Sequence, residues 1–190
     1  VRVFLRVLTL FATSLPVKAV SEPISLGEVL QLPFVDVAQT QAYASSPQNT
    51  VVNIRGSELS HGVVTLIHGG FWSNTYDQNY NLPMAEVLST IGYNVWIPEY
   101  RRVGDAGGGW PGSLDKIIAA VEFVTDKTGQ QPILVGHSIG GHRALRAAQT
   151  GLAVGGVVGL APISDLVSYG AESGSCQSMV APFMGDETYS

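Results

Sequence analysis

The sequence has little of what several common protein chemistries require. Only 13% of its 190 residues are charged, and a single cysteine, Cys176, is present. One cysteine excludes an internal disulfide and the paired-cysteine zinc and redox motifs. No histidine or predicted helix start lies beside it to activate the thiol, so we do not expect a cysteine nucleophile. The net charge of -5 offers no basic surface, and we expect no nucleic acid partner.

A segment long enough to cross a membrane is also missing near the N-terminus. The apolar segment 7–15 is too short to span a bilayer, so we expect no stable membrane insertion. It follows Arg2 and Arg6 and precedes the small residues Val17 and Ala19. This pattern is typical of a signal peptide over residues 1–19 and predicts a secreted or periplasmic protein. The alternative is that the segment forms a buried strand or helix, and residues 20–190 are expected to belong to a single domain.

What the chain does have is apolar residues, at 45%, and 22 glycines, a composition typical of an α/β protein with a buried sheet. Continuous or alternating apolar segments predict strands, and apolar residues at helical spacing predict helices. The predicted strands are 33–43, 49–55, 62–68, 93–98, 133–135 and 154–160, of which the first two are antiparallel. The predicted helices are 82–91, 114–127 with Ser113 as its N-cap, and 140–150. Strands and helices alternate, which predicts a mostly parallel sheet flanked by helices.

A serine lies in the segment Gly136-His137-Ser138-Ile139-Gly140, between a predicted strand and a predicted helix. In this context the pattern G-x-S-x-G indicates a sharp turn that exposes a nucleophilic serine. Gly136 and Gly140 are needed because the turn leaves no room for a Cβ atom near the nucleophile. We therefore predict Ser138 as the nucleophile. An ordinary strand-to-helix turn with glycines used only for packing is the alternative.

A second glycine-containing segment, His68-Gly69-Gly70-Phe71-Trp72, follows the strand predicted at 62–68. Acyl transfer places negative charge on a carbonyl oxygen, and backbone N–H groups of such a loop can stabilise it. We predict that the amide of Gly70 or Phe71 acts together with the amide of Ile139 as an oxyanion hole. His68 and Gly69 would support the loop. Simple turn formation by the two glycines is the alternative.

Three segments together resemble a known family. They are His68–Trp72, Gly136–His142, and Pro98-Glu99-Tyr100-Arg101-Arg102 leading to Gly109-Trp110-Pro111-Gly112. The chain resembles the α/β-hydrolase superfamily, in the esterase/lipase-like branch that includes kynurenine formamidase-type enzymes. The resemblance implies hydrolysis of a small ester, amide or formamide substrate through an acyl-enzyme, without a cofactor or metal.

The family's acid and histidine follow the nucleophile in the chain. No histidine follows His142, and Asp165 is the one candidate acid placed after a predicted strand, with a structural role as its alternative. His142 is only one helical turn beyond Ser138, whereas a triad base approaches the hydroxyl from across the cleft and is oriented by a carboxylate, so we do not expect His142 to be the base. The four histidines also lack the spacing of a zinc site. We therefore expect the domain to be incomplete at its C-terminus.

Two functions remain open from the sequence. The first is a serine hydrolase that uses Ser138, and the second is a non-catalytic protein that retains the scaffold for binding. Several aromatic residues either line a pocket for a ring-bearing substrate or only pack in the core: Trp72, Tyr76, Tyr80, Tyr100 and Trp110. The sequence carries no signal for an oligomeric state.

Overall fold

A computed structural model describes residues 25–29, 31, 39–45, 49–54 and 61–185. The chain divides into two compact units, Val1–Gln31 and Leu32–Ser190. In the first unit the structure describes one short helix, α1 (Leu26–Val29), preceded by Ser25, whose amide and hydroxyl donate to the Glu28 carboxylate. The predicted signal peptide and residues 33–38 of the first predicted strand lie outside the described residues. No helix among the described residues is both long and apolar enough to span a membrane.

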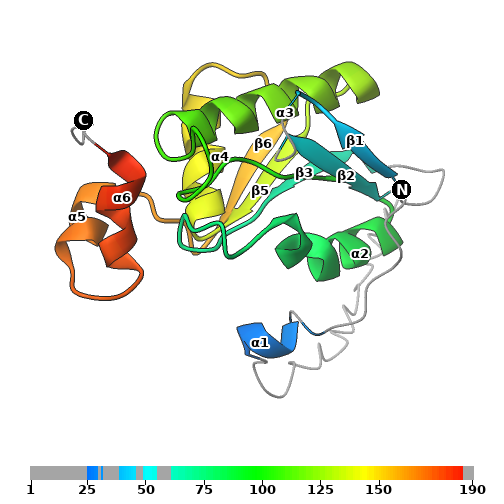
Figure 1. Ribbon diagram of the computed structural model, residues 1–190. Coiled ribbons are helices and arrows are strands. Elements are labelled where there is room, and N and C mark those ends of the chain that lie inside the picture. The colour runs from blue at the N-terminus through cyan, green and yellow to red at the C-terminus, as the bar shows by residue number, and fades with distance from the viewer. Residues whose placement is uncertain (1–24, 30, 32–38, 46–48, 55–60, 186–190) are drawn as a thin grey trace, which may run out of the picture. The chain divides into compact units, whose positions relative to one another are not determined.

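The second unit is built on a six-stranded sheet (Figure 1). Its spatial order is β1-β2-β4-β3-β5-β6, in which β2 runs antiparallel to both of its neighbours, β1 and β4, and β4, β3, β5 and β6 run parallel. The mostly parallel sheet and its antiparallel pair are therefore confirmed. The strands are β1 (Gln39–Ala42), β2 (Thr50–Ile54), β3 (Val63–Ile67), β4 (Asn94–Pro98), β5 (Ile133–His137) and β6 (Gly156–Leu160).

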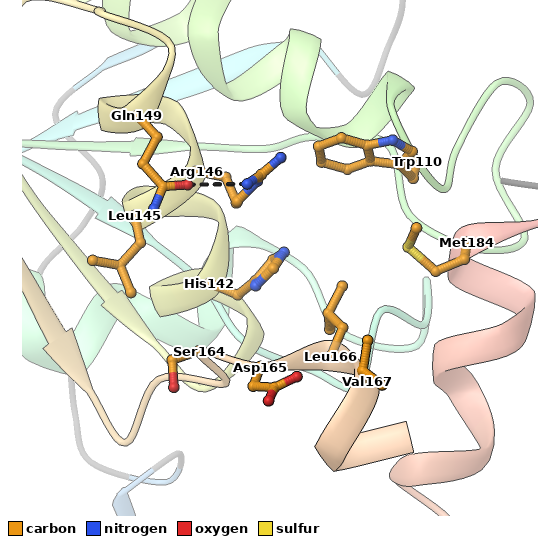
Figure 2. Close-up of a pocket in the computed structure, with 10 residues that line it drawn as sticks. All are labelled: Trp110, His142, Leu145, Arg146, Gln149, Ser164, Asp165, Leu166, Val167 and Met184. Carbon is orange, nitrogen blue, oxygen red and sulfur yellow. Dashed lines mark hydrogen bonds between the residues drawn. The ribbon is translucent and has the colours of Figure 1, made fainter. Parts of the chain in front are cut away.

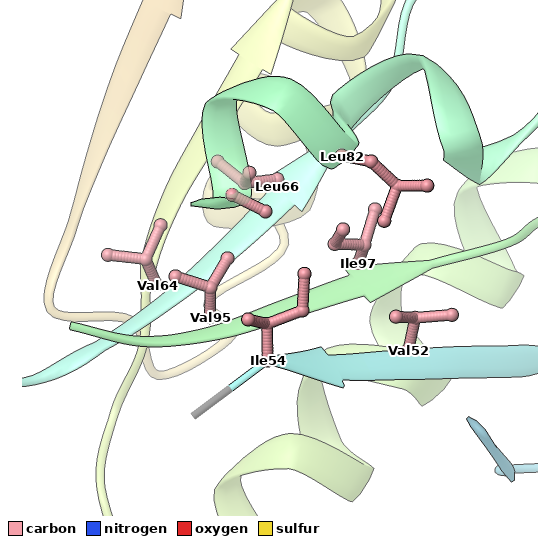
Figure 3. Close-up of a cluster of buried hydrophobic side chains, with 8 residues drawn as sticks. Val52, Ile54, Val64, Leu66, Leu82, Val95 and Ile97 are labelled. Atoms are coloured by element: carbon pink, nitrogen blue, oxygen red, sulfur yellow. The ribbon is translucent and has the colours of Figure 1, made fainter. Parts of the chain in front are cut away.

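Helices cover both faces of this sheet (Figure 1). The helix α2 (Leu82–Thr90), which follows the short 3-10 helix η1 (Gln78–Asn81), packs on one face. The helices α3 (Gly112–Thr128) and α4 (Ile139–Gln149) pack on the other. Successive strand residues serve opposite faces, as the two-residue period of a strand requires. Leu66 joins the α2 cluster (Figure 3), and the next residue, Ile67, joins the cluster under α3 and α4.

The start of α3 differs from the prediction. We expected Ser113 to cap this helix, but Pro111 is at the N-cap position and Ser113 lies inside the first turn. Its buried hydroxyl donates to the carbonyl of Arg101 instead. The cap assignment was therefore wrong, because the hydroxyl satisfies a carbonyl of the preceding loop and not an amide of its own helix.

β6 is followed by short helices that we did not predict from the sequence. They are α5 (Leu166–Ala171), the 3-10 helix η2 (Gln177–Met179) and α6 (Val180–Met184). Phe183 and Met184 of α6 share a buried cluster with Trp72 and Ile139. This end of the chain therefore packs against both glycine-containing segments singled out from the sequence.

Candidate active site

The predicted nucleophile lies at the turn between β5 and α4. Ser138 has φ 54° and ψ −119°, a region that side-chain-bearing residues rarely occupy. Backbone hydrogen bonds hold it there: the Ser138 amide donates to the carbonyl of Leu160 at 2.9 Å, and the Ser138 carbonyl accepts from the amide of Ile163 at 3.3 Å. A strained residue that its surroundings fix in this way is typical of a functional turn.

Steric contacts around the turn explain its two glycines. A Cβ atom on Gly136 would lie 2.3 Å from the carbonyl oxygen of Gly140, and one on Gly140 would lie 2.2 Å from that of Ile67. Both distances are far inside van der Waals contact, and both obstacles are backbone atoms that cannot rotate away. The expectation that neither position accepts a Cβ is confirmed.

The loop after β3 lies directly against this turn. A Cβ atom on Gly69 would be 3.5 Å from the Cβ of Ser138 and 3.1 Å from the carbonyl oxygen of His137. Gly70 has φ 113°, and a Cβ there would collide with Tyr76. The fold therefore brings together two segments that are about seventy residues apart in the sequence, as the G-x-S-x-G pattern and its partner loop predict.

The three amides assigned to an oxyanion hole share one property. Within the part of the chain that the structure describes, the N–H groups of Gly70, Phe71 and Ile139 have no hydrogen-bond acceptor in the protein. Ile139 is the first residue of α4, where amides lack an acceptor within the helix and the helix dipole favours negative charge. Phe71 has φ 55°, so the loop, like the turn, contains a strained residue. No acceptor among the described residues therefore competes for these N–H groups.

His68 anchors the loop from beneath. Its ring is fully buried, with Nδ1 2.8 Å from the Gly69 carbonyl oxygen and Nε2 3.1 Å from Oε1 of Glu99. The Tyr100 ring stacks on it at 4.3 Å, and the Tyr100 hydroxyl donates to the His68 carbonyl at 2.7 Å. The loop-supporting role predicted for His68 agrees with these contacts.

Glu99 is a member of the site that the sequence analysis did not identify as functional. Its carboxylate is buried and accepts from the amides of Gln78 and Tyr100, both at 2.9 Å, and Arg102 lies 3.3 Å away. Burial raises the pKa of Glu99, but the hydrogen bond and charge of His68, the charge of Arg102 and the Gln78 amide outweigh it and hold the pKa below its ordinary value. Its position directly after the predicted buried strand 93–98 is the sequence signal that could have indicated this residue.

Tyr80 and His137 form a second pair that the sequence did not indicate. The Tyr80 hydroxyl is 2.8 Å from Nδ1 of His137, and the two rings are stacked with 18° between their planes. Burial lowers the pKa of His137 and, with a smaller effect of Tyr76, raises the pKa of Tyr80. Both groups are therefore neutral near pH 7. The pair lies beside Ser138 and borders Gly69.

The structure places His142 and Asp165 in other roles. Nδ1 of His142 lies 2.9 Å from the Ile163 carbonyl oxygen. Asp165 is the N-cap of α5, and its carboxylate accepts from the amide and hydroxyl of Ser168. These two hydrogen bonds lower the pKa of Asp165. Asp165 as a catalytic acid stays a prediction, and its geometry is that of a helix cap.

No hydrogen bond joins the Ser138 hydroxyl to a histidine or a carboxylate in the described ranges. All four histidines of the sequence are described, and those other than His61 have the partners given above. Likewise, no three potential metal ligands of the His, Cys, Asp or Glu type gather anywhere in the described part of the chain.

Solved structures share this arrangement of strands and helices. The HSL homologue EstE7 from a metagenome library aligns with a TM-score of 0.66 and 18% identity, over 86% of this chain and 62% of its own. Esterase B from Lactobacillus rhamnosis, in a structure with a tributyrin phosphonate, aligns with a TM-score of 0.64 and 22% identity, over 78% of this chain and 55% of its own. An esterase/lipase from an uncultured bacterium aligns with a TM-score of 0.65 and 16% identity, over 90% of this chain and 66% of its own.

This chain therefore spans about 55% to 66% of the length of these three structures. At such identities the likeness concerns the fold alone. No curated protein sequence matches the chain significantly. The sequence profile of the alpha/beta hydrolase fold, however, matches residues 62–187, which include both the 68–72 loop and the Ser138 turn. The chain belongs to the α/β-hydrolase fold family.

Proposed function

We propose that the protein is a serine hydrolase in which Ser138 attacks the carbonyl carbon of a small carboxylic ester, amide or formamide. The observation that carries the proposal is the strained conformation of Ser138, with φ 54°, at the start of α4 and against the Gly69–Gly70 loop. Neither a structural serine nor a packing turn requires that conformation. The membership of the α/β-hydrolase fold family supports the same chemistry.

The proposed reaction forms an acyl-enzyme. The Ser138 oxygen bonds to the carbonyl carbon, and the carbonyl oxygen takes up negative charge that the amides of Ile139 and of Gly70 or Phe71 stabilise. The tetrahedral intermediate then expels the alcohol or amine, which leaves with a proton, and water later releases the acid. No cofactor or metal is part of this scheme.

The serine proton must pass to a general base. His68 is held at both ring nitrogens, and His137 is bonded to Tyr80 through Nδ1. His142 is bonded to Ile163 through Nδ1, and its ring has no hydrogen bond to the Ser138 hydroxyl. The proposal therefore requires a general base from outside the described residues, and its acid partner comes from there as well unless Asp165 takes that role. Asp165 would serve as that acid only if it were released from Ser168.

The substrate class is the least specific part of the proposal. Structural neighbours with esterase and lipase in their names support an ester, and the motif resemblance supports a formamide as well. Tyr76 is in edge-to-face contact with both Phe71 and Tyr80, and this aromatic group suits a substrate with an apolar or aromatic part. The signal peptide predicted at residues 1–19 supports a secreted or periplasmic location.

The direct test is hydrolysis of p-nitrophenyl acetate by the full chain as its gene encodes it, compared with two serine variants. We expect Ser138→Ala to lower kcat/KM by about a thousandfold or more. Ser164→Ala changes an exposed serine after β6 and should leave it unchanged. Equal rates for wild type and Ser138→Ala would contradict the proposal. Absence of hydrolysis in all three proteins would favour the non-catalytic scaffold instead.

A further inference from the structure

A cavity of about 350 Å³ lies beside α4 and is bordered by residues of α5 and α6 (Figure 2). We call it the α4–α5 cavity. His142 and Arg146 of α4 line it, together with Trp110, Leu166 and Met184, whereas Ser138 is not among its lining residues. The volume falls in the range of small-molecule sites. The cavity is therefore separate from the proposed nucleophile and large enough for a ligand of its own.

His142 contributes a hydrogen-bond acceptor to this cavity. Because Nδ1 is 2.9 Å from the carbonyl oxygen of Ile163, it carries the ring proton, and Nε2 presents a lone pair. Only 6% of His142 is exposed, and Nε2 has no partner among the described residues. Its ring extends into the space between Arg146 and Leu166 (Figure 2). A buried acceptor without a donor indicates that a ligand donor belongs there.

The protonation state of His142 keeps this acceptor available. Burial, and to a lesser extent the positive charges of Arg143 and Arg146, lower the pKa of His142 to about 4. The hydrogen bond to Ile163 raises the pKa, but its effect is smaller than that of burial. The ring is therefore neutral near pH 7. The same two positive charges disfavour an ammonium group at Nε2, so a hydroxyl is the donor that suits this position.

Arg146 contributes the positive charge. It is four residues after His142 on α4, so both side chains extend from one face of the helix. Its guanidinium lies 5.4 Å over the Trp110 ring and donates to the Gln149 side chain at 3.0 Å. Within the described ranges no carboxylate lies within 4.0 Å of it. Asp165, the acidic group at the cavity, uses its carboxylate to bind Ser168.

We propose that the α4–α5 cavity binds a small hydroxy acid with an apolar body. Its carboxylate would pair with the guanidinium of Arg146, and its hydroxyl would donate to Nε2 of His142. The apolar body would pack on Trp110, Leu166 and Met184. The proposal does not depend on the hydrolase function, because it concerns binding at a place that Ser138 does not line.

Calorimetric titration with three matched probes tests this site. The probes are 3-phenyllactate, 3-phenylpropionate, which lacks the hydroxyl, and 3-phenyllactamide, which lacks the charge. We expect 3-phenyllactate to bind the wild-type chain. Each of the other two probes should bind more weakly by about tenfold or more, because each lacks one charged or buried hydrogen bond. Arg146→Met should weaken the binding of 3-phenyllactate to the same extent. The control Lys127→Met, which removes an exposed cation of α3, should leave its affinity unchanged.

Three outcomes would overturn the proposal. Equal affinity of wild type and Arg146→Met for 3-phenyllactate would mean that the guanidinium of Arg146 does not bind the carboxylate. Absence of binding by all three probes up to millimolar concentration would mean that the cavity takes no such acid. Loss of 3-phenyllactate binding after a phosphonate has blocked Ser138 would place the ligand at the serine and not in the α4–α5 cavity.

Discussion

The two sides of the sheet around Ser138 differ in how completely they are packed. On the β3 side every strand residue of β3 is buried, and β4 is buried from Val95 to Pro98. On the β6 side no strand residue is buried, and Val158 is 45% exposed. Ser138 lies between the two, at the end of β5.

Buried polar atoms without a hydrogen-bond partner among the described residues occur on both sides, and they include Thr65 of β3 and Trp96 of β4. The buried groups that support the 68–72 loop, however, are paired with one another. On the β3 side, His68, Glu99 and Tyr100 bind one another and the loop backbone. On the α4 side, Nε2 of His142 and two guanidinium nitrogens of Arg143 are buried without a partner among the described residues. Arg143 donates to the Tyr100 hydroxyl at 3.2 Å and lies 4.4 Å over that ring.

The two sides therefore differ in the burial of their strands and in the pairing of the groups next to the 68–72 loop and next to the cavity. The β3 side fixes the loop and the turn, as a preorganised oxyanion site requires. On the α4 side the unpartnered Nε2 of His142 lies beside a cavity, as in a binding surface. Substitutions on the β3 side should therefore cost more stability than substitutions near β6, and the following predictions test that contrast.

Gly140→Ala should have the largest effect. Its Cβ would lie 2.2 Å from the carbonyl oxygen of Ile67, so the loop and helix α4 must move apart. We expect a loss of about 3 kcal/mol in the free energy of unfolding, measured by urea denaturation. The matched control is Gly156→Ala in β6, where a Cβ would meet nothing within 4 Å. Equal denaturation midpoints for the two variants would contradict the steric account of the turn.

Glu99→Gln should come next. The substitution keeps the volume but removes the charge that His68 and Arg102 bind, and we expect a loss of about 2 kcal/mol. The control Glu122→Gln removes an exposed carboxylate of α3 and should have little effect.

The same variant has a predicted pH dependence. The pKa of Glu99 is below its ordinary value of 4.5 in the folded chain, so its contribution to stability is present above that pH. It is lost as the pH falls through the lower folded value. The difference between wild type and Glu99→Gln in urea denaturation should therefore be constant above pH 5 or so and shrink on acidification. A difference that grows on acidification would contradict the ion-pair account.

Tyr80→Phe should have a smaller effect. It removes the hydroxyl that is 2.8 Å from Nδ1 of His137, and we expect a loss of about 1 kcal/mol in thermal or urea denaturation. Tyr93→Phe is the control, because no hydrogen bond of the Tyr93 hydroxyl is present in the described part of the chain. If both variants behave alike, the Tyr80–His137 bond does not stabilise the turn.

Asp165→Ala should have the smallest effect and separates two roles for this residue. As the N-cap of α5, it should slightly lower the melting temperature, as Ser168→Ala does, because each variant removes part of the same cap. Hydrolysis of p-nitrophenyl acetate should change by no more than about twofold, whereas loss of a triad acid lowers kcat about ten-thousandfold. A large loss of activity in Asp165→Ala alone would establish it as the acid.

The strands could be predicted well because the residues of buried strands form continuous or alternating apolar segments in the sequence. The strands expected at 62–68 and 93–98 are β3 and β4 to within one or two residues at each end, and the helix expected at 140–150 is α4. The helices after β6 were not predicted. α5 contains no buried residue, so it has no apolar face that periodicity could reveal.

The site was only partly predictable for a similar reason. Gly136, Ser138 and Gly140 follow one another in the chain, so a local pattern finds them. Glu99 and Tyr80 come to the turn through contacts across 31 and 57 residues, with His68 and His137 respectively. Such contacts depend on the packing of η1 and β4 beside β3, and no spacing in the sequence records them.

The central claim is that Ser138 is an activated nucleophile, and covalent labelling tests it most directly. The full chain would be treated with a fluorophosphonate, digested and analysed by mass spectrometry, with Ser138→Ala as the control. The account predicts a single adduct on the peptide that contains Ser138 and none in Ser138→Ala. An unlabelled Ser138, or an adduct of equal yield in Ser138→Ala, would contradict it.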